Sequence, residues 1–106
     1  MKVIWNKNAD RTLQQTADYI MSEFGEKSMA KFLREGYHIA DLLQFNPNMG
    51  RIEPLLDGFS KTYRSFVVTQ YNKMVYYIDG NRIIITAFWD MRREPGKLTG
   101  EIEKNN

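Results

Sequence analysis

Cysteine is absent from this 106-residue chain, and histidine occurs only once, as His38. The lack of cysteine excludes disulfides, thiolate catalysis and zinc sites built on sulfur ligands. His38 falls in the middle of a predicted helix, one position from its apolar stripe, so we interpret it as a surface or boundary residue. Because no second histidine and no close carboxylate pair accompanies it, the sequence predicts no metal and no cofactor.

Long apolar runs are also missing from the sequence. No stretch approaches the ~18 apolar residues that a membrane-spanning helix needs. The N-terminal residues lack the basic, apolar and small-residue pattern of a secretory signal, and no glycine-rich phosphate loop occurs. We therefore expect a cytoplasmic protein that neither enters a membrane nor uses a small-molecule cofactor.

A strong charge imbalance is absent as well, since the formal net charge is only +2. Residues 1–50 carry six basic and six acidic side chains, whereas residues 51–98 carry eight basic and five acidic ones. The small positive excess therefore lies in the second half of the chain. This distribution is compatible with an ordinary solvated surface and with a weak preference for an anionic partner.

The N-terminal quarter of the chain predicts a strand followed by a helix. Residues 2–5 are rich in β-branched and aromatic side chains, as in a short strand. Asn6 or Asn8 can cap the next helix by accepting a hydrogen bond from a free backbone N–H. Apolar residues at helical spacing continue to Phe24, and Gly25 is typical of a helix end.

A second helix is predicted from residues 26–28 to about residue 45. Pro47 ends it, because proline disfavours helical backbone in the residue before it. The short connection between the two helices predicts an antiparallel hairpin with one apolar face. Gly36 lies inside the second helix, where it either allows close approach to the first helix or is simply tolerated at a cost of ~1 kcal/mol.

The second half of the chain predicts three strands, at residues 63–69, 73–78 and 82–89, after an irregular loop at residues 48–58. Tight turns between consecutive strands predict an antiparallel meander, with the N-terminal strand at an edge. The predicted fold class is therefore α+β, with the helical hairpin packed on a mainly antiparallel four-stranded sheet in the order β-α-α-β-β-β.

The length of the chain fits one domain, which we place at residues 1–98. Beyond it, residues 99–106 are polar and glycine-containing, so we expect a flexible C-terminal tail. No internal repeat or linker divides the domain.

The predicted strands are apolar on both faces, although the helical hairpin can cover only one. In the middle strand, Met74 and Tyr76 alternate with Val75 and Tyr77. Two interpretations are open. The loop and the C-terminal segment cover the second face, or that face is a groove that binds another chain.

The polar residues of the second half could form an anion site. Arginines and lysines bind phosphates, aromatic rings stack on unpaired bases, and a nearby glutamate can take a proton from a ribose hydroxyl. Arg64 and Lys73 lie on paired strands and converge if both face the open side. Ordinary surface charge is the alternative account of the whole set, which comprises Arg51, Glu53, Lys61, Tyr63, Arg64, Lys73, Arg92 and Arg93.

Five short motifs follow one another along nearly the whole chain. They are N-A-D at Asn8–Asp10, F-G at Phe24–Gly25, P-N-M-G-R-I-E-P-L at Pro47–Leu55, M-V-Y-Y-I at Met74–Ile78 and F-W-D-M-R-R-E-P at Phe88–Pro95. In their order and spacing, these motifs and the predicted elements resemble the RelE/ParE family of bacterial type II toxins.

The resemblance implies a toxin that a cognate antitoxin neutralises by wrapping an extended segment and a helix around it. One branch of such proteins cleaves mRNA on the ribosome, whereas the ParE-like branch inhibits DNA gyrase and does no chemistry of its own. An antitoxin would also account for a second apolar face.

The nuclease branch implies roles for individual residues here. Glu53 falls where YoeB-like proteins place a general base, Arg64 falls near a phosphate-contacting residue, and Lys73 falls where that branch has an arginine. Arg92 or Arg93 falls near the arginine of the RelE-like C-terminal segment. We therefore predict a catalytic set of Glu53, Arg64, Lys73, Arg92 and Arg93, with RNA contacts from Arg51, Lys61 and Tyr63.

The chain also departs from that branch. Met91 and Arg92 stand in place of the YoeB-like His-Tyr ending, and the C-terminal tyrosine of RelE-like proteins has no counterpart. Arginine is a poor proton donor because its pKa exceeds ~12. The sequence favours a ribosome-dependent mRNA endonuclease without a metal, because Glu53 and the basic residues are retained. The alternatives are a non-enzymatic inhibitor of gyrase and a toxin-like protein that binds an antitoxin but has lost toxicity, and the missing general acid favours these two.

Overall fold

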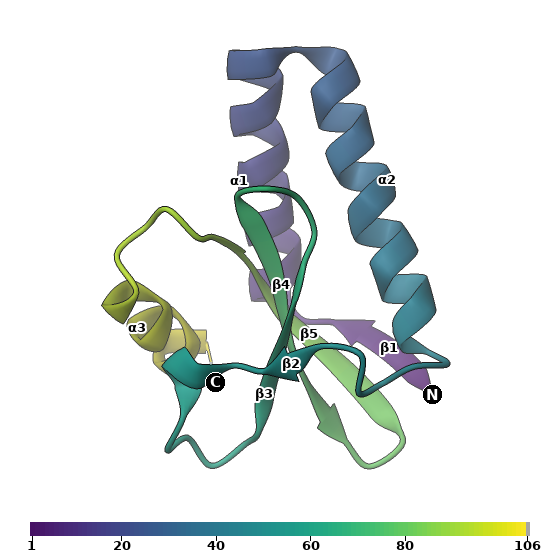
Figure 1. The fold of residues 1–106 in the computed structure, drawn as a ribbon, viewed down its shortest axis with the longest axis vertical. Coiled ribbons are helices and arrows are strands. Elements are labelled where there is room, and N and C mark those ends of the chain that lie inside the picture. The colour runs from purple at the N-terminus through teal and green to yellow at the C-terminus, as the bar shows by residue number, and fades with distance from the viewer. Residues whose placement is uncertain (106) are drawn as a thin grey trace.

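The computed structural model describes residues 1–105 and has an α+β fold (Figure 1). Within these residues no helix is long and apolar enough to cross a bilayer. The elements, in chain order, are β1 (Lys2–Trp5), α1 (Lys7–Phe24), α2 (Glu26–Leu43), β2 (Arg51–Ile52), the short 3₁₀ helix η1 (Pro54–Leu56), β3 (Tyr63–Val67), β4 (Asn72–Asp79), β5 (Arg82–Asp90) and α3 (Gly96–Asn105).

The predicted helical hairpin is confirmed. Asn6 caps α1, since its side-chain oxygen accepts a hydrogen bond from the backbone N–H of Ala9 at 2.9 Å. Gly25 joins α1 to α2 at φ 92°, a value that favours glycine. The second helix ends at Leu43, two residues earlier than predicted, and hydrogen-bonded turns continue to Asn46.

The sheet has five strands rather than the predicted four, in the order β1-β5-β4-β3-β2. The additional strand, β2, is only two residues long and pairs with β3, so it is too short to show an alternating pattern in the sequence. The meander of β3, β4 and β5 is antiparallel as predicted, and β1 joins the edge of β5 in parallel. β3 ends at Val67 instead of residue 69, because residues 68–71 form the turn.

The helical hairpin covers one face of the sheet and creates the larger core (Figure 1). Gly36 of α2 lies against Phe88 of β5 and Leu13 of α1, at 3.6 Å and 3.9 Å from an ideal Cβ position. These are ordinary contact distances, so this glycine is not required for close approach. The buried members of the core are Ala9, Leu13, Ala17, Phe32, Ile39, Ala40, Leu43, Met74, Tyr76, Ile83, Ile85 and Phe88.

The second face of the sheet is also covered, by η1 and α3, so the chain itself accounts for the two-sided apolar pattern. Leu98 and Ile102 of α3 are fully buried against this face. Residues 99–105 of the segment that the sequence leads us to expect as a flexible tail are therefore helical, and Ile102 among them is packed on the sheet, whereas residue 106 lies outside the described residues. The other buried members of this smaller core are Leu56, Tyr63, Val75, Ala87 and Trp89.

Candidate functional site: a buried ion pair and an aromatic groove

The loop that precedes β2 is held in place by two side chains of the sheet. The hydroxyl of Tyr76 donates to the carbonyl of Pro47 at 2.8 Å and accepts from the N–H of Gly50 at 2.9 Å. Arg64 donates to the carbonyl of Gly50 at 2.8 Å. Burial raises the pKa of Tyr76, so this phenol stays protonated. The loop thus delivers the next residues, including Glu53, to a fixed position.

Glu53 and Lys73 form a buried ion pair between the end of β2 and the start of β4. Their side chains are 0% and 8% exposed, respectively. One carboxylate oxygen, Oε1, accepts a hydrogen bond from the ammonium group of Lys73. The other, Oε2, is buried and has no hydrogen-bond partner among the described residues. The backbone N–H of Glu53 also donates to the carbonyl of Tyr63 at 2.8 Å, which fixes the residue beside β3.

Arg64 does not converge with Lys73, because the strand register places them on opposite faces. Lys73 pairs with Val67 of β3, and Arg64 is three residues away from Val67 along that strand. Side chains alternate between faces, so an odd separation puts Arg64 on the helical-hairpin side. Its guanidinium is engaged by the loop carbonyls there rather than standing beside Glu53.

The two arginines after β5 point in different directions. Arg93 lies 4.3 Å from the centre of the Trp89 ring, and Trp89 pairs with Lys73, so Arg93 is on the α3 side of the sheet. Arg92 instead contacts the rings of Tyr71 and Tyr19, and Tyr19 belongs to α1. Of the two arginines, Arg93 is therefore the one on the face of the sheet that carries Lys73.

Arg92 forms a bidentate ion pair with Asp90, with N–O distances of 3.0 Å and 2.8 Å. Hydrogen bonds from this guanidinium lower the pKa of Asp90, and the carboxylate in turn raises the pKa of Arg92. The pair fixes the chain as it leaves β5 and keeps the Arg92 guanidinium over the tyrosine rings.

Of the three residues predicted to contact RNA, one is buried and two are exposed. Tyr63 is 3% exposed and belongs to the smaller core. Lys61 is exposed and lies over the ring of Tyr77, 4.4 Å from its centre. Arg51 is exposed on β2. Lys61 and Arg51 are thus available to a partner in this conformation, whereas the ring of Tyr63 is not open for base stacking.

The geometry limits what Glu53 can do chemically. A general base must come within hydrogen-bond reach of the proton that it removes. Here the carboxylate is enclosed by protein, and Lys73 holds one of its oxygens. In this conformation, the pair is therefore a structural connection between β2 and β4, and it presents no carboxylate to a substrate.

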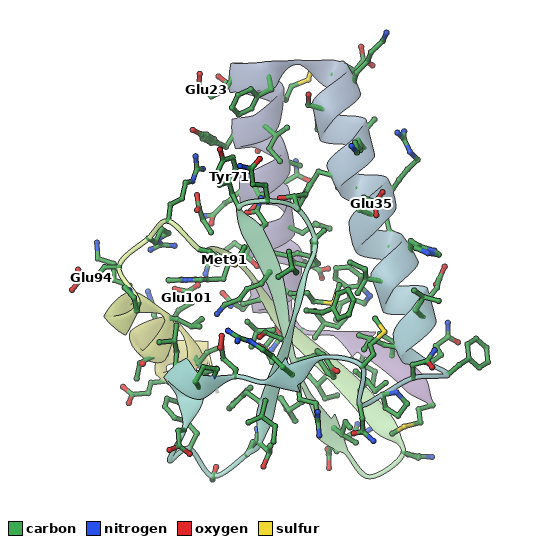
Figure 2. All side chains as sticks on the ribbon, viewed as in Figure 1. Glu23, Glu35, Tyr71, Met91, Glu94 and Glu101 are labelled. Atoms are coloured by element: carbon green, nitrogen blue, oxygen red, sulfur yellow. The ribbon has the colours of Figure 1, made fainter. Side chains whose placement is uncertain are left out.

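A groove of about 680 Å³ lies between the helical hairpin and the turn that joins β3 to β4. Tyr19 and Phe24 line it from α1, Tyr71 lines it from the turn, and Asp90 and Arg92 lie at the end of β5. Figure 2 labels Tyr71, in the turn before β4, and Met91, directly after β5; the N–H of Met91 donates to the carbonyl of Tyr71 at 2.7 Å.

The sequence pattern does not single out this groove. The apolar spacing assigns Phe24 to the buried face of the hairpin, yet this side chain is 61% exposed, and Tyr19 is 42% exposed. The available signal is the position of these rings in the last two turns of α1, beyond the point where the sheet can cover them. The groove combines aromatic rings with a fixed ion pair, which suits a protein partner.

Comparisons with known proteins agree with this architecture. The family described as ParE toxin of type II toxin-antitoxin system, parDE, matches residues 3–95. A comparison with curated protein sequences gave no match.

Three solved structures share the fold at low sequence identity. The chromosomal ParDE toxin–antitoxin system from P. aeruginosa has a chain with a TM-score of 0.69 and 18% identity, covering 85% of this chain and 95% of that one. The YoeB dimer from Staphylococcus aureus gives 0.55 and 17%, covering 82% and 92%. The YoeB/ParE toxin from Agrobacterium tumefaciens gives 0.58 and 17%, covering 85% and 98%.

The family match extends from β1 to the connection before α3 and includes both the buried ion pair and the residues of the groove. Membership in a toxin–antitoxin family implies a cognate antitoxin as a partner. The chain belongs to the ParE toxin family of type II toxin–antitoxin systems.

Proposed function

We propose that this chain is a toxin that acts by binding a target protein, DNA gyrase, and does no chemistry of its own. The observation that carries this proposal is the burial of Glu53. Its side chain is fully enclosed and paired with Lys73, so the general-base candidate is not presented to RNA. Gyrase is a cytoplasmic enzyme, and we expect the toxin to act in the same compartment.

Two further observations support a non-enzymatic mode. Arg64, the predicted phosphate contact, lies on the opposite face from Glu53 and donates to loop carbonyls. Met91 and Arg92 stand in place of the histidine and tyrosine of the nuclease branch, and Arg92 is a poor proton donor that Asp90 holds in place.

The second candidate function is ribosome-dependent mRNA cleavage. It is favoured by one specific arrangement, in which Glu53, Lys73 and Arg93 all lie toward the same face of the sheet. An arginine and a lysine beside a carboxylate can stabilise charge on a phosphate while the carboxylate accepts a proton. This function requires a conformation in which Glu53 is exposed.

One experiment separates the two functions. The chain is induced alone in cells, growth is followed, mRNA 5′ ends are mapped, and the purified protein is assayed for inhibition of gyrase supercoiling. We expect growth arrest, inhibited supercoiling and intact mRNA. Codon-phased cuts with normal supercoiling would instead identify the nuclease. Unimpaired growth with verified soluble protein would reject both and leave a toxin-like protein without toxicity.

We further propose that the cognate antitoxin docks in the aromatic groove. Exposed rings at a protein surface are typical of protein interfaces, and Phe24 is the most exposed ring of this groove. The variant Phe24→Asp should weaken binding of the purified antitoxin by tenfold or more, on the order of the loss of an interface anchor. His38→Asp, on the exposed surface of α2 outside the groove, is the matched control and should bind normally.

A further inference from the structure

The C-terminal helix α3 lies outside the part of the chain that matches the family model. The family match ends at residue 95, and α3 begins at Gly96. All seven residues from Met91 to Lys97 are exposed. The first part of this connection is tied to the sheet, since Arg92 pairs with Asp90 and Arg93 lies over Trp89, whereas Glu94 and Pro95 follow beyond these contacts. Figure 2 shows Met91 and Glu94 along this connection and Glu101 on the helix.

The first turn of α3 forms its backbone hydrogen bonds with the residues directly before it. The N–H of Lys97 donates to the carbonyl of Glu94 at 3.0 Å, and the N–H of Leu98 donates to the carbonyl of Pro95 at 3.1 Å. These first donors are satisfied within the segment and its connection rather than by the sheet. Movement of α3 away from the sheet would therefore keep these hydrogen bonds intact.

Few apolar side chains of α3 are buried in the smaller core. Two aliphatic side chains, Leu98 and Ile102, are fully buried beneath it. Glu101 pairs with Arg11 of α1, and the hydroxyl of Thr99 donates to the carbonyl of Leu55 at 3.4 Å. The helical hairpin, in contrast, contributes seven buried apolar residues to the opposite core and is joined to the sheet at both of its ends.

The carboxylate of Glu53, next to the segment on which α3 packs, would be stabilised by contact with water. α3 packs on η1, which begins directly after Glu53. Within the described chain, Glu53 Oε2 is buried without a hydrogen-bond partner, and a buried carboxylate oxygen in that state is unfavourable compared with a hydrated one. Opening of this region would hydrate the ion pair, which offsets part of the cost of exposing apolar surface when α3 leaves.

From these contacts we infer that α3 is a hinged cover, which opens as a unit about Glu94 and Pro95, beyond the residues that Asp90 and Trp89 hold in place, and controls access to the Glu53–Lys73 face. The closed form hides the ion pair and the smaller core from any partner. The open form exposes them while the helical hairpin and the main core stay folded. This inference rests on the geometry of α3 and not on the choice of gyrase or mRNA as target.

The absence of cysteine allows a direct test in the full-length chain. Ala87→Cys places a thiol in the core below α3, where the native side chain is 0% exposed. Ala17→Cys places a matched thiol in the core under the helical hairpin, at a residue that is 4% exposed. The rate of reaction with a thiol reagent under native conditions then reports the opening of each face separately.

The inference predicts that the thiol of Ala87→Cys reacts at least about tenfold faster than the thiol of Ala17→Cys. Low urea concentrations should also accelerate the Ala87→Cys reaction less steeply, since local opening exposes less surface than global unfolding. Adding Ile102→Ala should speed labelling of the Ala87→Cys variant by about tenfold or more and leave labelling of the Ala17→Cys variant nearly unchanged.

A second substitution keeps the test decisive if Ile102→Ala does not fold. Glu101→Ala removes the ion pair with Arg11 and should speed labelling of the Ala87→Cys variant about twofold to fivefold. The same substitution should leave labelling of the Ala17→Cys variant unchanged, because Ala17 lies in the opposite core.

Two results would overturn the inference. Equal rates and equal urea dependence for the Ala87→Cys and Ala17→Cys variants would mean that the face opens only by global unfolding. Fast labelling of the Ala87→Cys variant that neither α3 substitution changes would mean that another segment opens the face. Both outcomes can be read whether or not the chain inhibits growth.

Discussion

At the scale of single residues, the Glu53–Lys73 pair is the most consequential feature. Both charges are buried, and the cost of removing two charges from water can exceed the attraction between them. A family nuclease would need the carboxylate to be accessible, whereas a structural pair needs both partners to remain buried. Stability measurements on the two residues therefore distinguish these roles.

Replacing Lys73 alone should be severely destabilising. Lys73→Met leaves the Glu53 carboxylate buried without its partner, which should lower the free energy of unfolding by ~3–5 kcal/mol. The double variant Glu53→Leu/Lys73→Met removes both charges and should recover most of this loss. Urea unfolding followed by tryptophan fluorescence provides the measurement. A double variant as unstable as the single one would show that the pair is not a self-contained unit.

Replacement by alanine should change the stability of the fold in opposite directions at Gly50 and at Gly36. An ideal Cβ on Gly50 would lie 2.7 Å from the Tyr76 hydroxyl and 2.8 Å from the Ser65 carbonyl oxygen, so Gly50→Ala should destabilise the fold by ~1–3 kcal/mol. A Cβ on Gly36 meets its first neighbour at 3.6 Å, and alanine is the better helix former, so Gly36→Ala should stabilise by ~0.5–1 kcal/mol. Equal effects of the two substitutions on urea midpoints would contradict the close approach at Gly50.

At the scale of secondary-structure elements, the Asp90–Arg92 pair ties the end of β5 to the groove. The lowered pKa of Asp90 means that the folded state binds fewer protons than the unfolded state at acidic pH. The stabilisation is fully present above the unfolded pKa of ~3.9 and is lost as the pH falls through the lower folded pKa.

The stability of the Asp90→Asn variant should therefore fall less steeply than that of the natural chain as the pH becomes acidic. Between neutral pH and about pH 4, the variant should have a lower Tm than the natural chain, and the difference should shrink as the pH falls below ~3.9. Thermal unfolding at a series of pH values tests this directly. A difference that stays constant down to about pH 2, below the usual range of an aspartate pKa, would assign the effect of the substitution to packing rather than to charge.

The elements also show what the sequence could and could not predict. The helical hairpin follows from a 3.6-residue apolar period over 18 residues in each helix, and three strands follow from tight turns and β-branched runs. β2 has only two residues, too few for any period. α3 is anchored by Leu98 and Ile102 and contains Gly96 and Gly100, which lower helix propensity, so its packing emerges only from the tertiary contacts.

The candidate site was predictable only in part, for a related reason. The sequence predicts one site for Glu53, from the loop, and Lys73, from the start of a strand, and the two side chains are paired in the structure. The separation of Arg64 from Lys73 depends on which residue of β3 faces Lys73, and that register is fixed by pairing across the sheet. The opposite directions of the two arginines after β5 likewise depend on Asp90 and Trp89, whose faces follow from the same register.

At the scale of the whole molecule, the chain is a sheet with a cover on each side. The helical hairpin covers one face of the sheet and α3 lies on the other side (Figure 1). An aromatic groove lies between the helical hairpin and the turn that joins β3 to β4. We propose that the groove receives the antitoxin while the ion pair stays enclosed. This arrangement agrees with our proposal of a toxin that works by binding, and the inferred opening of α3 would have to precede any chemistry of Glu53.

The most direct measurement compares the natural chain with Glu53→Leu/Lys73→Met, each induced in cells without antitoxin, with growth, mRNA 5′ ends and plasmid supercoiling followed together. The account predicts that both proteins arrest growth and relax plasmids while mRNA stays intact, because the pair is structural. Codon-phased mRNA cuts by the natural chain, lost together with growth arrest in a double variant that is folded and soluble, would contradict it.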